Sequence, residues 1–158
     1  MELRVGIGYD AHALEEGLAL VLGGVTIDYP RGLAGHSDGD VIAHALIDAL
    51  LGAANLGDIG SLFPSGDEQY RGASSLDLLW EAYREVREVG WELVNADCVL
   101  VGEEPRIGDV RDEMCQRLAS TLGIEPGRIT VRATTTDRLG FTGRGEGLAA
   151  QAVALLQR

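Results

Sequence analysis

The three histidines of this 158-residue chain all lie within its first 44 residues, beside several aspartates. Asp10 and His12 follow an apolar segment, 3–9, that is typical of a buried strand. In an extended strand, residues i and i+2 point to the same face, so these two side chains could share one ion. Asp10 and His12 are therefore the first pair of candidate metal ligands.

His44 is the third candidate ligand, and it lies in a segment whose apolar residues recur at helical spacing. It stands four residues from Asp40 and four from Asp48, so it belongs to a polar stripe on an otherwise apolar helix. Two imidazoles and one carboxylate form a three-ligand set typical of catalytic zinc, and imidazole suits zinc better than magnesium. The alternative is that His12 is a surface residue and His44 a core histidine bonded to Asp40 or Asp48.

Two polar loops that follow expected strands could bind an anion. The first, 133–147 (ATTTDRLGFTGRGEG), has a run of threonines, two arginines and four glycines. Hydroxyls and exposed backbone N–H groups can bind phosphate oxygens, although GRGEG does not match the dinucleotide-binding fingerprint. The second loop, 102–109 (GEEPRIGD), also follows a strand, where open α/β sheets usually bind ligands. Each loop could equally be a plain connection, the second one a helix start with Pro105 in its first turn.

Apolar periodicity predicts the elements that must position these groups. We expect a hairpin over 18–29 with its turn at Gly23-Gly24, and a helix capped by Ser37 or Asp38 and ended by Gly57. The other expected elements are a functional loop over 58–72, a helix from Ser74 to Gly90 with a capping-box-like Ser74 and Asp77, strands over 92–101 and 129–134, and helices over 107–122 and 148–156. This alternation predicts an α/β fold, an α+β sandwich whose mixed β-sheet is covered on one face by helices, with an N-terminal hairpin, in one domain over 1–158.

Composition excludes several classes of function. The chain has 13 basic and 25 acidic residues and a formal net charge of −12, which disfavours binding to nucleic acid or to an anionic membrane. Every basic residue is an arginine, so neither a P-loop lysine nor a Schiff-base lysine is present. Cys98 and Cys115 form no CxxC motif, which argues against a thiolate zinc cluster or a disulfide framework. Because no signal-peptide pattern or membrane-length apolar run is found, we expect a cytoplasmic protein.

Four segments together carry a resemblance to one enzyme family. They are GYDAH at 8–12, HSDGDVIAHALIDALLGAANLGDIG at 36–60, LFPSGD at 62–67 and ATTTDRLGFTGRGEG at 133–147. In this order, over almost the whole chain, they resemble the 2-C-methyl-D-erythritol 2,4-cyclodiphosphate synthases. The resemblance implies a homotrimer with active sites between adjacent subunits, acting in the non-mevalonate route to isoprenoid precursors. It also implies a phosphorus–oxygen lyase that converts 4-diphosphocytidyl-2-C-methyl-D-erythritol 2-phosphate to 2-C-methyl-D-erythritol 2,4-cyclodiphosphate and releases CMP.

The same resemblance implies a role for each residue that matches the family's motifs. The zinc ligands fall on Asp10, His12 and His44, the three residues that the spacing also indicates. His36 and Thr135 are expected to be catalytic, and Asp137 to hold magnesium or manganese where the family usually has glutamate. Arg106 stands where the family often has lysine. The residues expected to bind substrate are Ser37, Asp58, Ile59, Gly60, Phe63, Pro64, Ser65, Gly66, Asp67, Gly102, Pro105, Arg106, Ile107, Gly108, Ala133, Thr134, Thr136, Phe141 and Arg144.

The implied reaction needs no general base, because the 2-phosphate of the substrate is already an anionic nucleophile. The enzyme must fold the substrate back on itself and neutralise the repulsion between phosphates, and two divalent cations can do both. A metal-bound histidine usually donates its other N–H to a carboxylate or carbonyl. Asp38, Asp40 and Asp48 are therefore candidates to orient His44.

Two alternatives to this function remain open. A zinc-dependent phosphohydrolase would use the same three ligands to activate water, and its product would be linear. A trimeric binding protein would instead hold an isoprenoid diphosphate in a cavity on the threefold axis, ringed by the residues matching Phe141, Arg144 and Glu146.

Overall fold

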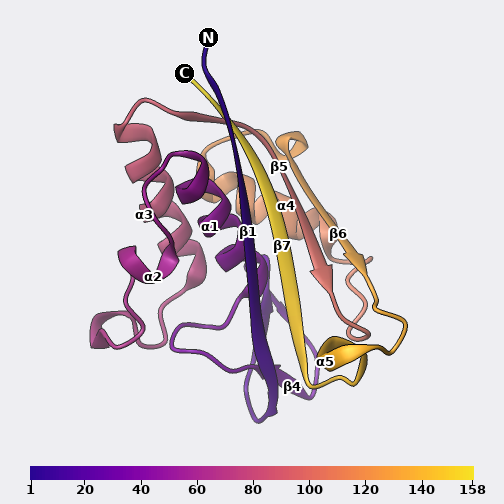
Figure 1. Ribbon diagram of the computed structural model, residues 1–158. Coiled ribbons are helices and arrows are strands. Elements are labelled where there is room, and N and C mark those ends of the chain that lie inside the picture. The colour runs from indigo at the N-terminus through magenta and orange to yellow at the C-terminus, as the bar shows by residue number, and fades with distance from the viewer.

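A computed structural model describes all of residues 1–158 (Figure 1). The strands are β1 (Leu3–Glu16), β2 (Leu20–Leu22), β3 (Val25–Ile27), β4 (Arg31–Leu33), β5 (Glu92–Val101), β6 (Ile129–Thr134) and β7 (Gly147–Gln157). The helices are α1 (Val41–Ala53), α2 (Ile59–Leu62), α3 (Ser75–Glu88), α4 (Arg111–Leu122) and α5 (Gly140–Gly143), with 3₁₀ turns η1 (Glu68–Tyr70) and η2 (Pro126–Arg128). None of these helices combines the length and the apolar composition that a membrane span requires.

The main sheet has five strands in the order β4-β1-β7-β5-β6. Strands β5 and β6 are parallel and the other pairs are antiparallel, so the mixed sheet that the sequence predicts is confirmed. Helices α1 and α4 lie behind the sheet in Figure 1, and α3 packs against both of them. The predicted hairpin is also confirmed, because Leu22 pairs with Val25 around Gly23 and Gly24, both at positive φ.

The prediction of a helix over 148–156 is wrong. This segment is strand β7, which pairs with β1 on one side and β5 on the other. Its alanines and leucines have high helix propensity, but Ala150, Ala152 and Ala154 are buried while Gln151 and Val153 are exposed. That alternation has the period of two that a strand requires. Pairing along both edges outweighs local propensity here.

Helix α1 approaches β1 closely enough to bring His44 near the sheet. A Cβ atom at Gly6 or Gly8 would overlap the backbone of α1 at Ala49 or Ala45, so only glycine permits this separation. The facing side chains on α1 are small, because Ala45 and Ala49 lie one turn apart on its buried face. His44 therefore lies over the end of β1 that carries the other candidate ligands.

Several predicted boundaries differ from the observed ones. Helix α1 is capped by Asp40 rather than by Ser37 or Asp38, and it ends at Ala53, before Gly57. Asp40 is the better cap because its carboxylate also accepts hydrogen bonds from Gly23 N and Gly24 N, at 2.9 and 2.7 Å. Burial raises the pKa of Asp40 to about 6, although hydrogen bonds from backbone N–H groups oppose the rise.

The later boundaries differ for similar local reasons. The loop 58–72 contains α2 and η1, which Asp58 and Asp67 cap. Ser74 precedes α3 but makes no side-chain capping bond, so the capping box expected with Asp77 does not form. Helix α4 begins at Arg111, so 102–109 is a loop rather than a helix start.

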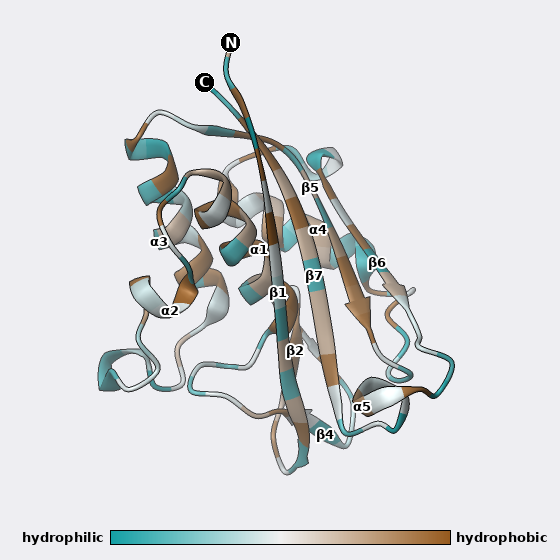
Figure 2. Cartoon of the chain, in the orientation of Figure 1, coloured by the Kyte–Doolittle hydropathy of each residue, from teal (hydrophilic) through white to brown (hydrophobic).

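The face of the sheet that carries no helices is apolar and exposed. On β1 the side chains at odd positions point away from the helices, and Figure 2 shows hydrophobic colour along the N-terminal half of this strand. Val5 is 70% exposed and Ile7 63% exposed. Leu3, Tyr9 and Val153 are exposed in the same way. A continuous apolar surface of this kind usually marks a contact with another protein.

Candidate metal centre and substrate cavities

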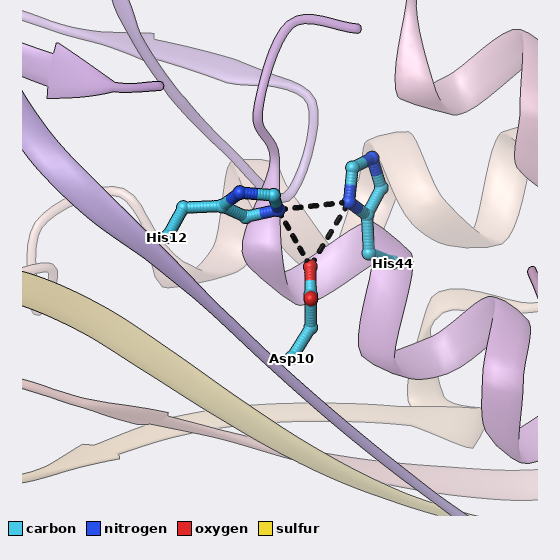
Figure 3. A group of neighbouring side chains, drawn as sticks. All are labelled: Asp10, His12 and His44. Carbon is cyan, nitrogen blue, oxygen red and sulfur yellow. Dashed lines mark hydrogen bonds and ion pairs between the residues drawn. The ribbon is translucent and has the colours of Figure 1, made fainter. Parts of the chain in front are cut away.

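Asp10, His12 and His44 converge on one point between β1 and α1 (Figure 3). Asp10 Oδ2 lies 2.8 Å from His12 Nε2 and 3.0 Å from His44 Nδ1, and the two ring nitrogens are 3.2 Å apart. Strand β1 runs to Glu16, so the extended backbone that places Asp10 and His12 on one face persists through both residues. The structure thus brings the three predicted ligands together.

The chemistry of these three groups fits a zinc ion. Two imidazole nitrogens and a carboxylate oxygen are common zinc ligands, and a catalytic site keeps a fourth position for water or substrate. Atoms bound at about 2.0 to 2.1 Å in a tetrahedral site lie about 3.3 Å from one another. The observed separations of 2.8 to 3.2 Å are close to that value. The residues could therefore hold such an ion with little rearrangement.

The protonation of the metal-free triad reflects its mutual contacts. Burial raises the pKa of the Asp10 carboxyl, but hydrogen bonds and charge interactions with His12 and His44 outweigh burial and lower it to about 2. The hydrogen bond to Asp10 is also the main reason that the pKa of His12 is raised, although burial opposes it. A hydrogen bond to the Ala34 backbone adds to the rise in the pKa of His12. A cation at this site competes with a proton on His12.

This competition predicts that zinc affinity falls as the pH is lowered. The neutral imidazole binds the metal, so below the raised pKa of His12 a proton must leave for each zinc that binds. We expect the apparent affinity to weaken by up to about tenfold per pH unit in that range. Competition with a chromophoric chelator between about pH 8 and pH 5.5 measures it. A constant affinity over this range would show that His12 does not bind the ion.

The far side of the His44 ring is held by hydroxyl groups rather than by a carboxylate. His44 Nε2 lies 2.8 Å from Ser75 Oγ and 3.0 Å from Ser37 Oγ. None of the three candidate acids bonds to His44. Asp38 bonds to Ser75, Asp40 caps α1, and Asp48 accepts a hydrogen bond from Ile59 N at 2.7 Å. The sequence pattern missed Ser75, because it lies 31 residues beyond His44 at the start of α3.

A cavity of about 410 Å³ opens beside the triad. Eight residues of its wall are ones that the sequence predicts to be catalytic or to bind substrate: His36, Ser37, Ile59, Gly60, Phe63, Pro64, Ser65 and Gly66. Tyr70, which was not predicted, also lines the cavity. His36 Nε2 lies 2.7 Å from the Asp67 carbonyl oxygen, so His36 is connected to the loop that forms the outer wall. Asp58 and Asp67 themselves face other partners, since each caps a short helix.

A second cavity, of about 470 Å³, lies at the ends of β5 and β6. Its lining contains seven residues expected to bind substrate, together with Thr135, which is expected to be catalytic: Gly102, Pro105, Arg106, Ile107, Gly108, Ala133, Thr134 and Thr135. Thr136 is turned elsewhere and donates its hydroxyl hydrogen to Leu139 O, at 2.6 Å. Asp137 and Phe141 are exposed and line neither cavity.

The two cavities are separated within one chain. Asp10 pairs with Ala150, which pairs with Leu100, which pairs with Ala133, so these residues form one row across four strands. Three strand spacings amount to about 14 Å. The two cavities share no lining residue. A short ligand therefore cannot contact both cavities of the same chain.

The fold and the site together define an α+β protein with a mixed sheet and a candidate His₂Asp metal centre. Comparison with known proteins places it more narrowly. The chain belongs to the YgbB family, whose profile matches residues 3–157.

Its relatives carry a consistent name. The 2-C-methyl-D-erythritol 2,4-cyclodiphosphate synthase of Moorella thermoacetica is 58% identical over 154 residues, covering 98% of this chain and 94% of the relative. The synthase of Rubrobacter xylanophilus is 59% identical, covering 98% and 95%. A synthase structure in the CDP-bound form superposes with a TM-score of 0.89 at 41% identity, covering 98% of this chain and 100% of that one. The bifunctional IspDF of Campylobacter jejuni gives a TM-score of 0.95 at 46% identity, and this chain covers 42% of it.

Proposed function

We propose that this protein is a cytoplasmic 2-C-methyl-D-erythritol 2,4-cyclodiphosphate synthase. It would convert 4-diphosphocytidyl-2-C-methyl-D-erythritol 2-phosphate to the cyclic diphosphate and CMP, as a phosphorus–oxygen lyase of the non-mevalonate pathway. The observation that carries the proposal is the convergence of Asp10, His12 and His44 beside a cavity, in a chain whose relatives bear this name over nearly their whole length.

The residues of the two cavities suit the two ends of this substrate. Backbone groups of Gly102 to Gly108 and the threonines after β6 surround a space that suits a nucleotide, with Arg106 as the positive charge. The triad cavity combines polar groups with Phe63 and Pro64, which suits a methylated sugar alcohol. His36 and Ser37 lie on its wall, where they can contact the 2-phosphate. Holding the 2-phosphate near the diphosphate in this way favours ring closure.

Divalent cations would supply the positive charge that brings three phosphates together, zinc at the triad and magnesium or manganese at the diphosphate. Asp137 is the candidate carboxylate for the second ion. It is exposed, has φ of 52°, and its Oδ1 lies 3.4 Å from Thr135 Oγ1. Thr135 would stabilise the transition state from the same loop, because it lines the second cavity.

Substitution of Asp137 tests this second cation. Asp137→Asn keeps the shape and removes the charge, so we expect a higher Mg²⁺ requirement and a slower release of CMP in a protein that stays folded. Asp137→Glu has a longer side chain and should lower the Mg²⁺ concentration for half-maximal rate or leave it unchanged, since magnesium tolerates displaced ligands poorly. Neither variant should alter zinc content. Wild-type Mg²⁺ dependence in Asp137→Asn would exclude Asp137 as a ligand.

We further propose a homotrimer with active sites between adjacent subunits. The exposed apolar face of the sheet offers a surface for this assembly, because Val5, Ile7 and Tyr9 would be removed from water. The α-phosphate belongs to the nucleotide end of the substrate and the β-phosphate to the sugar-alcohol end, and the two are neighbours. The two cavities that would hold these ends are separated within one chain, which supports a site shared between subunits. The cavity beside the triad (the metal cavity) of one subunit would then meet the cavity at the ends of β5 and β6 (the nucleotide cavity) of the next subunit.

Complementation between inactive variants tests the shared site. His12→Ala damages the metal cavity and Thr135→Ala the nucleotide cavity, so each homotrimer should be inactive. In a 1:1 mixture, a site is intact when both of its subunits contribute the undamaged cavity, which gives ½ × ½, or about one quarter of the sites. We expect recovery of about that fraction of wild-type activity after co-refolding. No recovery in mixed trimers verified by mass spectrometry would show that each chain holds a whole site.

A third cavity, of about 400 Å³, has a lining of mixed charge that includes Glu103 and Glu104 beside four arginines. Arg31, Arg106, Arg138 and Arg144 contribute to it, although Arg144 is also paired with Glu146 at 2.9 Å. The alternative binding function would instead hold an isoprenoid diphosphate on the threefold axis, ringed by Phe141, Arg144 and Glu146, and of these only Arg144 lines this cavity. The aligned donor atoms of the triad favour catalysis over binding alone.

Phosphorus NMR of the protein incubated with substrate, Zn²⁺ and Mg²⁺ separates these functions. Synthase activity gives resonances of a cyclic diphosphate together with CMP. A phosphohydrolase gives linear phosphates, and a binding protein leaves the substrate spectrum unchanged.

A further inference from the structure

Behind the metal triad, the half-buried Asp38, which precedes α1, is hydrogen-bonded to Ser75 at the start of α3. Ser75 is fully buried, and its backbone N–H donates to Asp38 Oδ2 at 3.0 Å. The Ser75 hydroxyl group donates its hydrogen to Asp38 Oδ1. Ser75 Oγ also lies 2.8 Å from His44 Nε2. Figure 3 shows that this ring nitrogen points away from Asp10 and His12.

The Asp38 carboxylate sets the direction of the hydrogen bonds behind the His44 ring. A carboxylate can only accept hydrogen bonds, so the single hydrogen of the Ser75 hydroxyl group goes to Asp38. Ser75 Oγ must then accept from His44, and the ring hydrogen is on Nε2. Ser37 Oγ, at 3.0 Å, is a second acceptor for the same N–H. Nδ1, the atom that faces Asp10 and His12, is then the ring nitrogen that can offer a lone pair to a metal bound there.

We propose that Asp38 and Ser75 are positioning residues, which fix the His44 ring with its Nδ1 lone pair directed at the metal. Behind many metal-binding histidines a single carboxylate accepts the second ring N–H and orients the ring. Here Ser75, at the start of α3, and Asp38, just before α1, would serve this purpose together. The inference deepens the proposed function and rests on its metal site, but neither Asp38 nor Ser75 contacts the metal or the substrate in this arrangement.

A double-mutant cycle on zinc affinity tests the proposal. Ser75→Ala should weaken zinc binding by about tenfold and Asp38→Ala by between about tenfold and 100-fold, the range typical of groups that support metal ligands. Because Asp38 acts on His44 through Ser75, the two losses of zinc affinity should not add. The double variant should bind zinc as tightly as whichever single variant has the lower affinity. A purely structural role for Asp38 would instead make the two effects multiply.

The chain offers a matched control for each change. Ser74→Ala alters the neighbouring serine, whose side chain makes no capping bond, and should keep wild-type zinc affinity. Asp48→Asn removes a nearby charge without touching the pair, since Asp48 bonds to Ile59 N. Zinc affinity is measured by chelator competition at fixed pH, with circular dichroism to confirm folding.

A spectroscopic signal gives a second readout that needs no substrate. In the zinc-loaded protein the His44 Nε2–H should give an imidazole resonance protected from exchange with water, and Ser75→Ala should accelerate that exchange at least tenfold. Ser75→Ala leaves the carboxylate of Asp38 free to keep its backbone partner, so this test stands even if Asp38→Ala does not fold. Unchanged affinity and exchange in Ser75→Ala, or multiplied effects in the double variant, would overturn the proposal. These outcomes are independent of phosphorus NMR, in which the proposed synthase activity itself succeeds or fails.

Discussion

The His44→Ala variant is expected to lose both bound zinc and cyclisation, while the protein remains folded. His44 Nδ1 is one of three donor atoms that face one another across 2.8 to 3.2 Å, so its removal leaves two ligands for the ion. Loss of a supporting hydrogen bond costs about 10- to 100-fold in metal affinity or activity, and the loss of a ligand should exceed that. Zinc per chain after gel filtration, by plasma mass spectrometry, and the initial rate of CMP release measure the two effects.

His36→Ala is the matched control for that experiment. His36 lies in the same cavity but bonds to the Asp67 carbonyl oxygen and not to the triad, so this variant should keep its zinc. A folded His44→Ala protein with undiminished zinc would show that the triad is not the metal site.

The second large effect is on stability, in Asp40→Ala. The Asp40 carboxylate caps α1 at Ala43 N and also accepts from Gly23 N and Gly24 N in the β2–β3 turn, and it is fully buried. Alanine would leave the N–H groups of buried Gly23 and Ala43 and of half-buried Gly24 without partners and would remove the cap, which we expect to lower the free energy of unfolding by about 3 to 5 kcal/mol. Urea unfolding at one fixed protein concentration measures the change.

Asp40→Asn is the intermediate case. Asparagine can accept two of the three hydrogen bonds through its carbonyl oxygen, but its amide group then faces the third N–H. We expect it to destabilise the protein less than alanine does. If Asp40→Ala cost under about 1 kcal/mol, the three contacts would not be holding the hairpin to the helix.

Local rules predicted the part of the site that lies on two regular elements. Asp10 and His12 are two residues apart on a strand, and His44 is on a helix whose apolar spacing is clear, so their residue types and periodicity sufficed. What brings the strand and helix together, the close contact at Gly6 and Gly8, is a property of the packing. The glycines are visible in the sequence, but their partners on α1 are not.

Long-range contacts explain what the sequence did not predict. The strand β7 was expected to be a helix because alanine-rich segments favour helices, and only its two neighbouring strands determine otherwise. The cap of α1 is Asp40 because the hairpin donates two more hydrogen bonds to it. Ser75 was missed for the same reason. A serine at the start of a helix suggests only a capping role, and its contact with His44 depends on the packing of α3 against α1. Which of several neighbouring polar residues caps a helix cannot be decided from the sequence when distant hydrogen-bond partners determine the choice.

The most direct test of the whole account is the dependence of product structure on zinc. Protein stripped of metal with a chelator and held in excess Mg²⁺ is titrated with Zn²⁺, while phosphorus NMR follows the substrate. The account predicts no turnover without zinc, and a cyclic diphosphate with equimolar CMP that rises until about one zinc per chain is bound, as three ligands from one chain imply. A linear product, or cyclisation that proceeds equally without zinc, would contradict it.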